Sequence, residues 1–220
     1  MEVEIVLNGK QIVSCKQKLH DFVHHDAYVN YDKRGTKGAP DPNVISWQHV
    51  TTINRMMART PRKAWEPIIG KTLPDLIKIP HDLDLVDSDE EQINSIVRSS
   101  YRFVVEALIV PWIKDMAATK VLHLKRPRLV AISDSYVRTQ LGVEEKQPPG
   151  LRAVSVAKAV RKLAQQNAEA LAELKRFANG LCDPQGDPVA LSKIRILDIL
   201  LWVEQARHSN HCFWSTRYPP

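Results

Sequence analysis

The sequence has few of the residues that mark several protein classes. Its 220 residues include three cysteines, at positions 15, 182 and 212. An odd number of widely spaced cysteines excludes a disulfide scaffold and a four-cysteine zinc or iron–sulfur site, and it fits a reducing compartment. The sequence also has no glycine-rich phosphate loop, no Gly-x-Ser-x-Gly and no His-Glu-x-x-His. These absences argue against the commoner nucleotide, esterase and metalloprotease sites.

Long hydrophobic runs are absent as well. No stretch approaches the roughly 20 apolar residues that cross a bilayer. The first residues, Met1-Glu2-Val3-Glu4, carry acids where a secretory signal carries bases. We therefore expect a soluble cytoplasmic protein that does not bind a membrane.

The overall composition is that of a folded globular protein. Hydrophobic residues make up 44% and charged residues 25% of the chain. Lysine and arginine number 31 against 25 aspartates and glutamates, which gives a formal charge of +6. A basic balance favours a polyanionic partner, although many proteins without such a partner are equally basic.

Local patterns predict a mainly α-helical fold with one small β-hairpin. Asn8-Gly9 lies between two β-rich arms and predicts a tight hairpin turn over residues 2–14. Apolar spacing and capping residues predict the helices. One is begun by Ser46, one by a Ser88–Glu91 capping box, and one by Ser133 or Asp134, the last being ended by Gly142. The expected helical ranges are 47–58, 88–113, 116–124, 134–141, 151–178 and 189–206.

These elements predict one domain over residues 1–220. The hairpin decorates a helical body over residues 16–207, and residues 208–220 form an irregular tail. The last helix is apolar almost throughout, so it is either the central core helix or part of a dimer interface. Its periodicity does not decide between them, and the oligomeric state stays open.

The most informative stretch runs from Ala118 to Val137. It places Lys120 on a short helix, follows it with a basic turn that contains a proline, and puts Asp134 at the start of the next helix. An aspartate there can simply cap the helix. The same position also holds a carboxylate rigidly at the edge of a cleft, so Lys120 and Asp134 are our candidate catalytic residues.

This stretch resembles an uncharacterised bacterial family that is common in actinobacteria. The shared pattern is Thr-Lys-x-Leu-His-x-Lys-Arg-Pro-Arg-Leu, followed by an Asp-Ser pair, and here it covers residues 119–129 and 134–135. Tyr31-Asp32 and the run from Arg195 to Trp202 also look shared. The resemblance covers most of the chain and implies no assigned activity.

Residues 130–138 also resemble the segment around the catalytic aspartate of helix-hairpin-helix DNA glycosylases. This likeness implies a glycosylase-like helical fold in which Asp134 stabilises an oxocarbenium-like sugar. It also implies that Lys120 is the Schiff-base nucleophile of a bifunctional enzyme, and that the target base is flipped out of the duplex. The chain lacks the Gly-x-Gly of that family's hairpin, and its 14-residue Lys-to-Asp spacing is short. The resemblance therefore supports the fold more than the chemistry.

A basic cluster surrounds the candidate pair. Such a cluster can hold phosphates, because each cation that neutralises one releases counterions. We therefore predict nucleic acid, with DNA favoured, as the partner, and base excision as a possible activity. The predicted nucleic-acid-binding residues are Lys125, Arg126, Arg128 and Arg138.

Two other interpretations stay open. In the first, the chain is a structural or interaction protein, and Lys120 and Asp134 are buried against each other with no pocket beside them. In the second, it is an enzyme for a small anionic metabolite, with a closed pocket lined by Arg126 or Arg128.

Three further groups are weaker candidates. Arg195 and Asp198 are spaced to pair within one helix, and Asp198 is a candidate second carboxylate. Tyr31 and Asp32 either line the same cleft or form a simple turn. The tail residues His208, His211 and Cys212 supply three potential zinc ligands, but a closed site needs a fourth. We therefore expect no metal and no cofactor.

Overall fold

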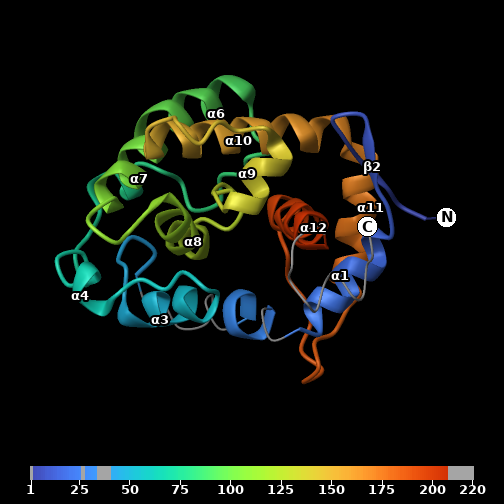
Figure 1. Ribbon diagram of the computed structural model, residues 1–220, viewed down its shortest axis with the longest axis horizontal. Helices are drawn as coiled ribbons and strands as arrows, with labels where there is room; N and C mark the ends of the chain where they lie inside the picture. The colour runs from blue at the N-terminus through green and yellow to red at the C-terminus, as the bar shows by residue number, and fades with distance from the viewer. Residues whose placement is uncertain (1, 26–27, 34–40, 208–220) are drawn as a thin grey trace.

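The computed structural model describes residues 2–25, 28–33 and 41–207, and within them the chain is mainly helical with one small two-stranded sheet (Figure 1). Two of the helical segments, η1 and η2, have π-helical geometry. The elements in chain order are β1 (Ile5–Leu7), β2 (Lys10–Ile12), α1 (Cys15–Val23), η1 (Tyr28–Lys33), α3 (Trp47–Arg55), α4 (Arg62–Trp65), α5 (Pro74–Ile77), α6 (Glu90–Ile96), η2 (Val97–Tyr101), α7 (Arg102–Leu108), α8 (Asp115–Lys125), α9 (Ser135–Leu141), α10 (Pro149–Gln166), α11 (Ala168–Asn179) and α12 (Lys193–Arg207).

Two helices, α8 and α12, occupy the interior, and the others pack around them (Figure 1). Ten of the eleven residues of α8 are buried, and the apolar residues of α12 from Ile194 to Val203 are buried except for half-buried Trp202. The apolar last helix is therefore a core helix, which periodicity alone did not decide.

The hairpin forms as predicted. Its strands are antiparallel, with Ile5 opposite Ile12 and Leu7 opposite Lys10. The turn residues Asn8 and Gly9 both have positive φ, at 50° and 79°. This is the conformation that makes Asn-Gly suited to two-residue hairpins.

Local capping signals are also confirmed. Ser46 begins α3 with a reciprocal capping box to His49. Asp134 begins α9 by accepting a hydrogen bond from the backbone N–H of Tyr136, and Gly142 ends that helix in the left-handed conformation. A cap depends only on neighbouring residues, so it can be recognised from sequence.

The helix predicted over residues 88–113 is wrong at both ends. Asp89, and not Ser88, caps the first turn, because the Ser88 hydroxyl instead accepts a hydrogen bond from the backbone N–H of Asp84. The helix passes through the π-helical segment η2 and ends at Leu108. Residues 110–113 then form a tight turn around Pro111, whose ring cannot continue a helix.

The single helix predicted over residues 151–178 is two helices, α10 and α11, which meet at Asn167. The side chain of Asn167 accepts a hydrogen bond from the backbone N–H of Val6 at 2.7 Å and donates to its carbonyl at 3.0 Å. It also donates to the carbonyl of Leu163 at 2.9 Å. The apolar spacing continues across the break, so periodicity did not reveal it.

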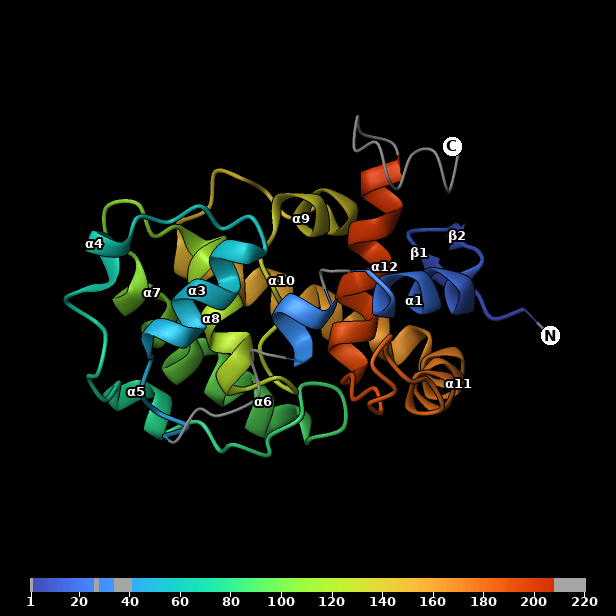
Figure 2. The same ribbon diagram turned by 90° about the horizontal axis from the view of Figure 1, so that it is seen from below.

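The helices of the described chain include none that is both long enough and apolar enough to cross a membrane. Figure 2, which shows the molecule from below, places α12 between the hairpin with α1 and α11 on one side and α3 and α8 on the other. This arrangement brings α1, α3, α8, α9 and α12 around one region of the interior.

We expect Asn167→Ala to destabilise the fold by about 2–3 kcal/mol, because it removes three hydrogen bonds and leaves the Val6 backbone groups without them. Urea unfolding followed by circular dichroism measures the change. The matched control is Gln166→Ala, at an exposed neighbouring position, which should change stability by less than about 0.5 kcal/mol. Equal effects of the two substitutions would contradict the role of Asn167.

Candidate functional site

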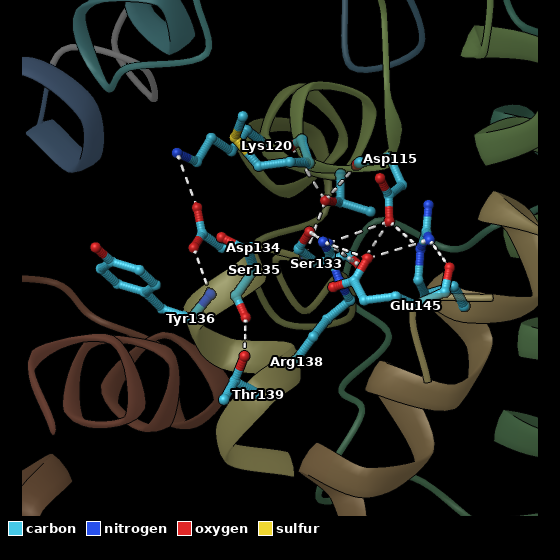
Figure 3. Close-up of polar contacts among 12 residues, drawn as sticks. Asp115, Lys120, Ser133, Asp134, Ser135, Tyr136, Arg138, Thr139 and Glu145 are labelled. Atoms are coloured by element: carbon cyan, nitrogen blue, oxygen red, sulfur yellow. Dashed lines mark hydrogen bonds and ion pairs between the residues drawn. The ribbon is translucent and has the colours of Figure 1, made fainter. Parts of the chain in front are cut away.

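The structure brings Lys120 and Asp134 together (Figure 3). The Lys120 ammonium lies 3.7 Å from a carboxylate oxygen of Asp134. The same ammonium donates a hydrogen bond to the backbone carbonyl of Met56 at 2.8 Å. Both side chains are largely buried, with 8% of the Lys120 side chain and 16% of the Asp134 side chain exposed.

The local structure explains how this pair is held. Lys120 lies in the middle of α8, and Asp134 lies directly after a buried segment that returns along it. Ser133 fixes the return, because its backbone N–H donates to the hydroxyl of Thr119 at 2.9 Å. The Asp134 carboxylate then caps α9 with one oxygen and faces Lys120 with the other (Figure 3).

A cavity lies beside the pair, and we call it the inner cavity. The space that the centre of a water-sized sphere can occupy in this cavity is about 50 Å³. One buried water needs about 10–15 Å³ on that scale, so the cavity has room for a few waters or a small polar group. It is lined by Phe22, His25, Tyr31, Met56, Lys120, Ile132, Asp134, Arg195, Asp198, Ile199 and Trp202.

Arg195 of α12 organises the opposite wall of the inner cavity. Its guanidinium binds both carboxylate oxygens of Asp32, at 2.7 and 2.9 Å, and also pairs with Asp198 one turn along α12. The rings of Phe22 and Tyr31 cover it, with centroids 5.3 and 5.0 Å away. The predicted Arg195–Asp198 pair is therefore present.

Charged side chains of both signs line the inner cavity. Lys120 and Arg195 are the cations, and Asp134 and Asp198 carry the carboxylates, whereas Asp32 pairs with Arg195 but is not among the lining residues. A carboxylate fixed beside such a cavity favours a cation or a transition state that develops positive charge.

Burial shifts the proton affinities of this network. Desolvation lowers the pKa of Lys120 from its ordinary value, against the opposing effect of Asp134. Desolvation also raises the pKa of Asp198 to about 6, although Arg195 opposes this rise. A lysine and a carboxyl group shifted towards neutrality beside one cavity are features of proton-transfer and nucleophilic sites.

The structure gives Lys125 and Arg126 internal partners. Lys125 is buried and donates to the carbonyl of Asp41 at 2.7 Å. Arg126 is 2% exposed and makes five hydrogen bonds. Its acceptors are the carbonyls of Pro42, Leu76, Ile79 and Lys125 and the side-chain oxygen of Asn43. Phosphate binding by these two residues stays a prediction, and their burial weighs against it.

Arg138 and Arg128 differ from each other. Arg138 is buried and pairs with Asp115 and Glu145 (Figure 3). The Arg128 side chain is 53% exposed and pairs with Asp84 at 2.9 Å. Of the four predicted phosphate ligands, Arg128 alone has an exposed side chain, and none of the four lines the inner cavity.

Sequence reasoning missed several residues of the site. Asp115 is buried and bonds to Ser133, Arg138 and Arg152, which anchors the segment that leads to Asp134. In sequence it is indistinguishable from an ordinary acid in the first turn of a helix. The cavity walls formed by Phe22 and Trp202 also carry no sequence signal, because large apolar residues are usual in cores.

The possible zinc ligands His208, His211 and Cys212 lie outside the described residues. Within the ranges that the structure describes, no cluster of three or more His, Cys, Asp or Glu side chains is arranged to hold a metal ion.

The comparison with protein families identifies a family of unknown function, DUF6308, whose model matches residues 19–205. The chain belongs to this family. The comparisons with curated proteins and with solved structures gave no match. Membership confirms a family without assigned activity and leaves the likeness to DNA glycosylases without support.

The buried guanidinium of Arg126 should be essential to this DUF6308 chain. Arg126→Met removes five hydrogen bonds and leaves buried carbonyls unsatisfied. We expect a loss of about 3 kcal/mol or more in the free energy of unfolding, measured in urea. The control Arg128→Met removes an exposed cation and should cost less than about 1 kcal/mol. A small effect of Arg126→Met would show that these contacts do not stabilise the fold.

His123 makes stability depend on pH. Nδ1 of its buried ring donates a hydrogen bond to the carbonyl of Val130 at 2.7 Å. Desolvation lowers the pKa of His123 to about 4. Between pH 6.5 and 4 the unfolded chain therefore binds a proton that the folded chain does not. The contribution of His123 to stability is present above pH 6.5 and is lost as the pH falls through that interval.

We expect His123→Asn to reduce the loss of stability between pH 6.5 and 4 by roughly 1–3 kcal/mol relative to the parent chain. His49, with a pKa lowered to about 4, still contributes in the same direction, and Asp198 contributes in the opposite one. Urea unfolding at several pH values measures the difference. The control is His81→Asn, which removes a histidine at an exposed position.

Proposed function

We propose that the chain cleaves N-glycosidic bonds in nucleic acid, with DNA as the favoured substrate. The observation that carries the proposal is the Lys120–Asp134 pair beside the inner cavity. Breaking the bond between C1′ of the sugar and the base leaves positive charge on the sugar. A fixed carboxylate such as Asp134 stabilises that charge more than it stabilises the neutral ground state.

The steps of the reaction assign roles to three residues. The C1′–N bond breaks, and its electron pair leaves with the base nitrogen. Water adds to C1′ and gives a proton to the Asp134 carboxylate, while the base nitrogen takes a proton from the carboxyl group of Asp198. In this proposal Lys120, whose pKa is lowered, attacks C1′ of the aldehyde product and forms an imine with loss of water.

The walls of the inner cavity suit a planar group. Phe22, Tyr31 and Trp202 contribute aromatic rings, and base–aromatic stacking stabilises an unstacked base. A nucleobase is larger than the cavity, so its entry requires side chains to move. Four residues line the cavity and are only half-buried, so they lie between the cavity and solvent: His25, Met56, Asp134 and Trp202.

An architectural role is the second candidate, and specific contacts favour it. Lys120 satisfies the carbonyl of Met56, and Asp134 caps α9. In this interpretation the two residues only stabilise the fold. It does not account for the cavity beside them.

The test uses DNA oligonucleotides, single-stranded and duplex, each with one uracil, hypoxanthine, 8-oxoguanine or 3-methyladenine. Mass spectrometry measures the released base. Asn caps helices as well as Asp does, so Asp134→Asn should keep the cap of α9 and lower the release rate by about 100-fold or more. Asp89→Asn makes the same change at the cap of α6 and should leave the rate unchanged.

Borohydride treatment with an abasic duplex tests the role of Lys120. The hydride reduces an imine to a stable secondary amine, so a cross-linked product is expected for the parent chain and not for Lys120→Met. Release of no base from any of these oligonucleotides, together with no Lys120-dependent cross-link, would favour the architectural role.

A further inference from the structure

Trp112 is the most exposed large hydrophobic residue of the described chain. Its relative exposure is 76%, against 48% for Phe103. It lies in the loop between α7 and α8, at the corner of a turn closed by a hydrogen bond from the backbone N–H of Ile113 to the carbonyl of Val110 at 2.9 Å. Packing therefore does not explain why an indole occupies this position.

The backbone of the turn does not explain the indole either. Pro111 occupies the second position and Trp112 the third, where φ is +78°. This is the arrangement of a type II turn, whose third position favours glycine. A side chain held at positive φ is strained, and such strain is concentrated at functional sites. The indole therefore opposes the local conformation and is mostly in solvent.

A surface groove runs beside Trp112, and we call it the Trp112 groove. The space that the centre of a water-sized sphere can occupy in this groove is about 870 Å³. Exposed Arg59 and Lys63 line it, prolines at 61, 67 and 111 form much of its wall, and no acidic side chain is among its lining residues. The groove thus combines two cations with one exposed aromatic ring.

The wall opposite Trp112 is preorganised. Thr60 is bonded to the side chain of Asn54 through its backbone N–H, its carbonyl and its hydroxyl, each at 2.9 Å. The buried indole of Trp65 donates to the same hydroxyl at 2.9 Å. Met57 and Arg59, in the loop held by these bonds, also have positive φ. A loop held this firmly loses little entropy when it binds a ligand.

We propose that the Trp112 groove binds single-stranded nucleic acid. One base stacks on the indole of Trp112, and flanking phosphates pair with Arg59 and Lys63. Cations that track the backbone and an aromatic ring that stacks a base are the two elements of single-strand binding. A single strand is required because the face of a base in a duplex is covered by its neighbours.

This inference goes beyond the chemistry proposed for the inner cavity, since binding in the groove needs no reaction there. The two sites share one loop: Met56 lines the inner cavity and accepts a hydrogen bond from Lys120, and Arg59 lines the groove. Three residues span at most about 11 Å. Arg59, which pairs with a flanking phosphate in this proposal, is therefore within about 11 Å of Met56 along the chain.

Fluorescence anisotropy with a labelled single-stranded 20-mer tests the proposal. Trp112→Gly should weaken binding by about 5- to 150-fold, the range expected for one base–aromatic stack. The same variant should unfold at the same temperature or a higher one, because glycine relieves the positive φ. Arg59→Ala/Lys63→Ala should reduce the salt slope of log K by about 1.4, as expected for two phosphates of a single strand.

Matched controls separate the groove from the rest of the surface. Phe103→Ala removes an exposed aromatic ring of α7, and Lys146→Ala/Lys158→Ala removes two exposed cations elsewhere. Both should bind like the parent chain. Asp134→Asn should also bind the single strand like the parent chain. The binding assay therefore tests the groove separately from the proposed chemistry.

An oligomer of abasic sugar-phosphate units tests whether stacking of a base on Trp112 contributes to binding. It should bind the parent chain more weakly than the normal strand, and Trp112→Gly should not weaken it further. Equal binding of the two strands, equal competition by polyglutamate, or unchanged binding of the Trp112→Gly variant would overturn the proposal. Equal competition by polyglutamate would indicate an acidic protein segment as the occupant.

Discussion

The burial of α8 on every side is the constraint on which the rest of the structure depends. A surface helix leaves its polar side chains in water, but α8 carries two lysines, a histidine and an aspartate into the interior. Each of them must find an internal partner, because an unpaired buried polar group costs several kcal/mol. The partners come from distant segments: the hydroxyl of Tyr31 donates to the carbonyl of Lys120, and Lys125 donates to Asp41. Because these partners lie in the surrounding loops, pairing the buried polar groups of α8 orders those loops.

The candidate site arises where this constraint meets α12, the second interior helix. Arg195 and Asp198 of α12 line the inner cavity together with Lys120 of α8. Two interior helices that both carry charge cannot close against each other as two apolar faces would. The inner cavity, which is lined by charged residues of both helices, lies at that junction. The strained turn that carries Trp112 leads directly into α8 and belongs to the same part of the chain.

The sequence predicted the features that depend on neighbouring residues. The Asn8-Gly9 turn, the Ser46 cap and the helix from Asp134 to Gly142 were all recognisable, because turns and caps are decided within a few positions. It did not predict the break at Asn167, whose cause lies 161 residues away at Val6. Nor did it distinguish Lys125 and Arg126 from Arg128. All three are basic residues of one short segment, and only their different burial separates them.

The sequence by itself determined the mainly helical class, the hairpin and the bounds of α8 to within a residue, and it singled out the stretch that contains Lys120 and Asp134. The tertiary structure alone decided that Lys120 and Asp134 meet and that the inner cavity lies beside them. It also decided that Asp32 and Asp198 share Arg195. The physical reason is one of range. Backbone conformation follows from local sterics and hydrogen bonds, whereas the burial and pairing of a charge depend on which remote segments pack against it.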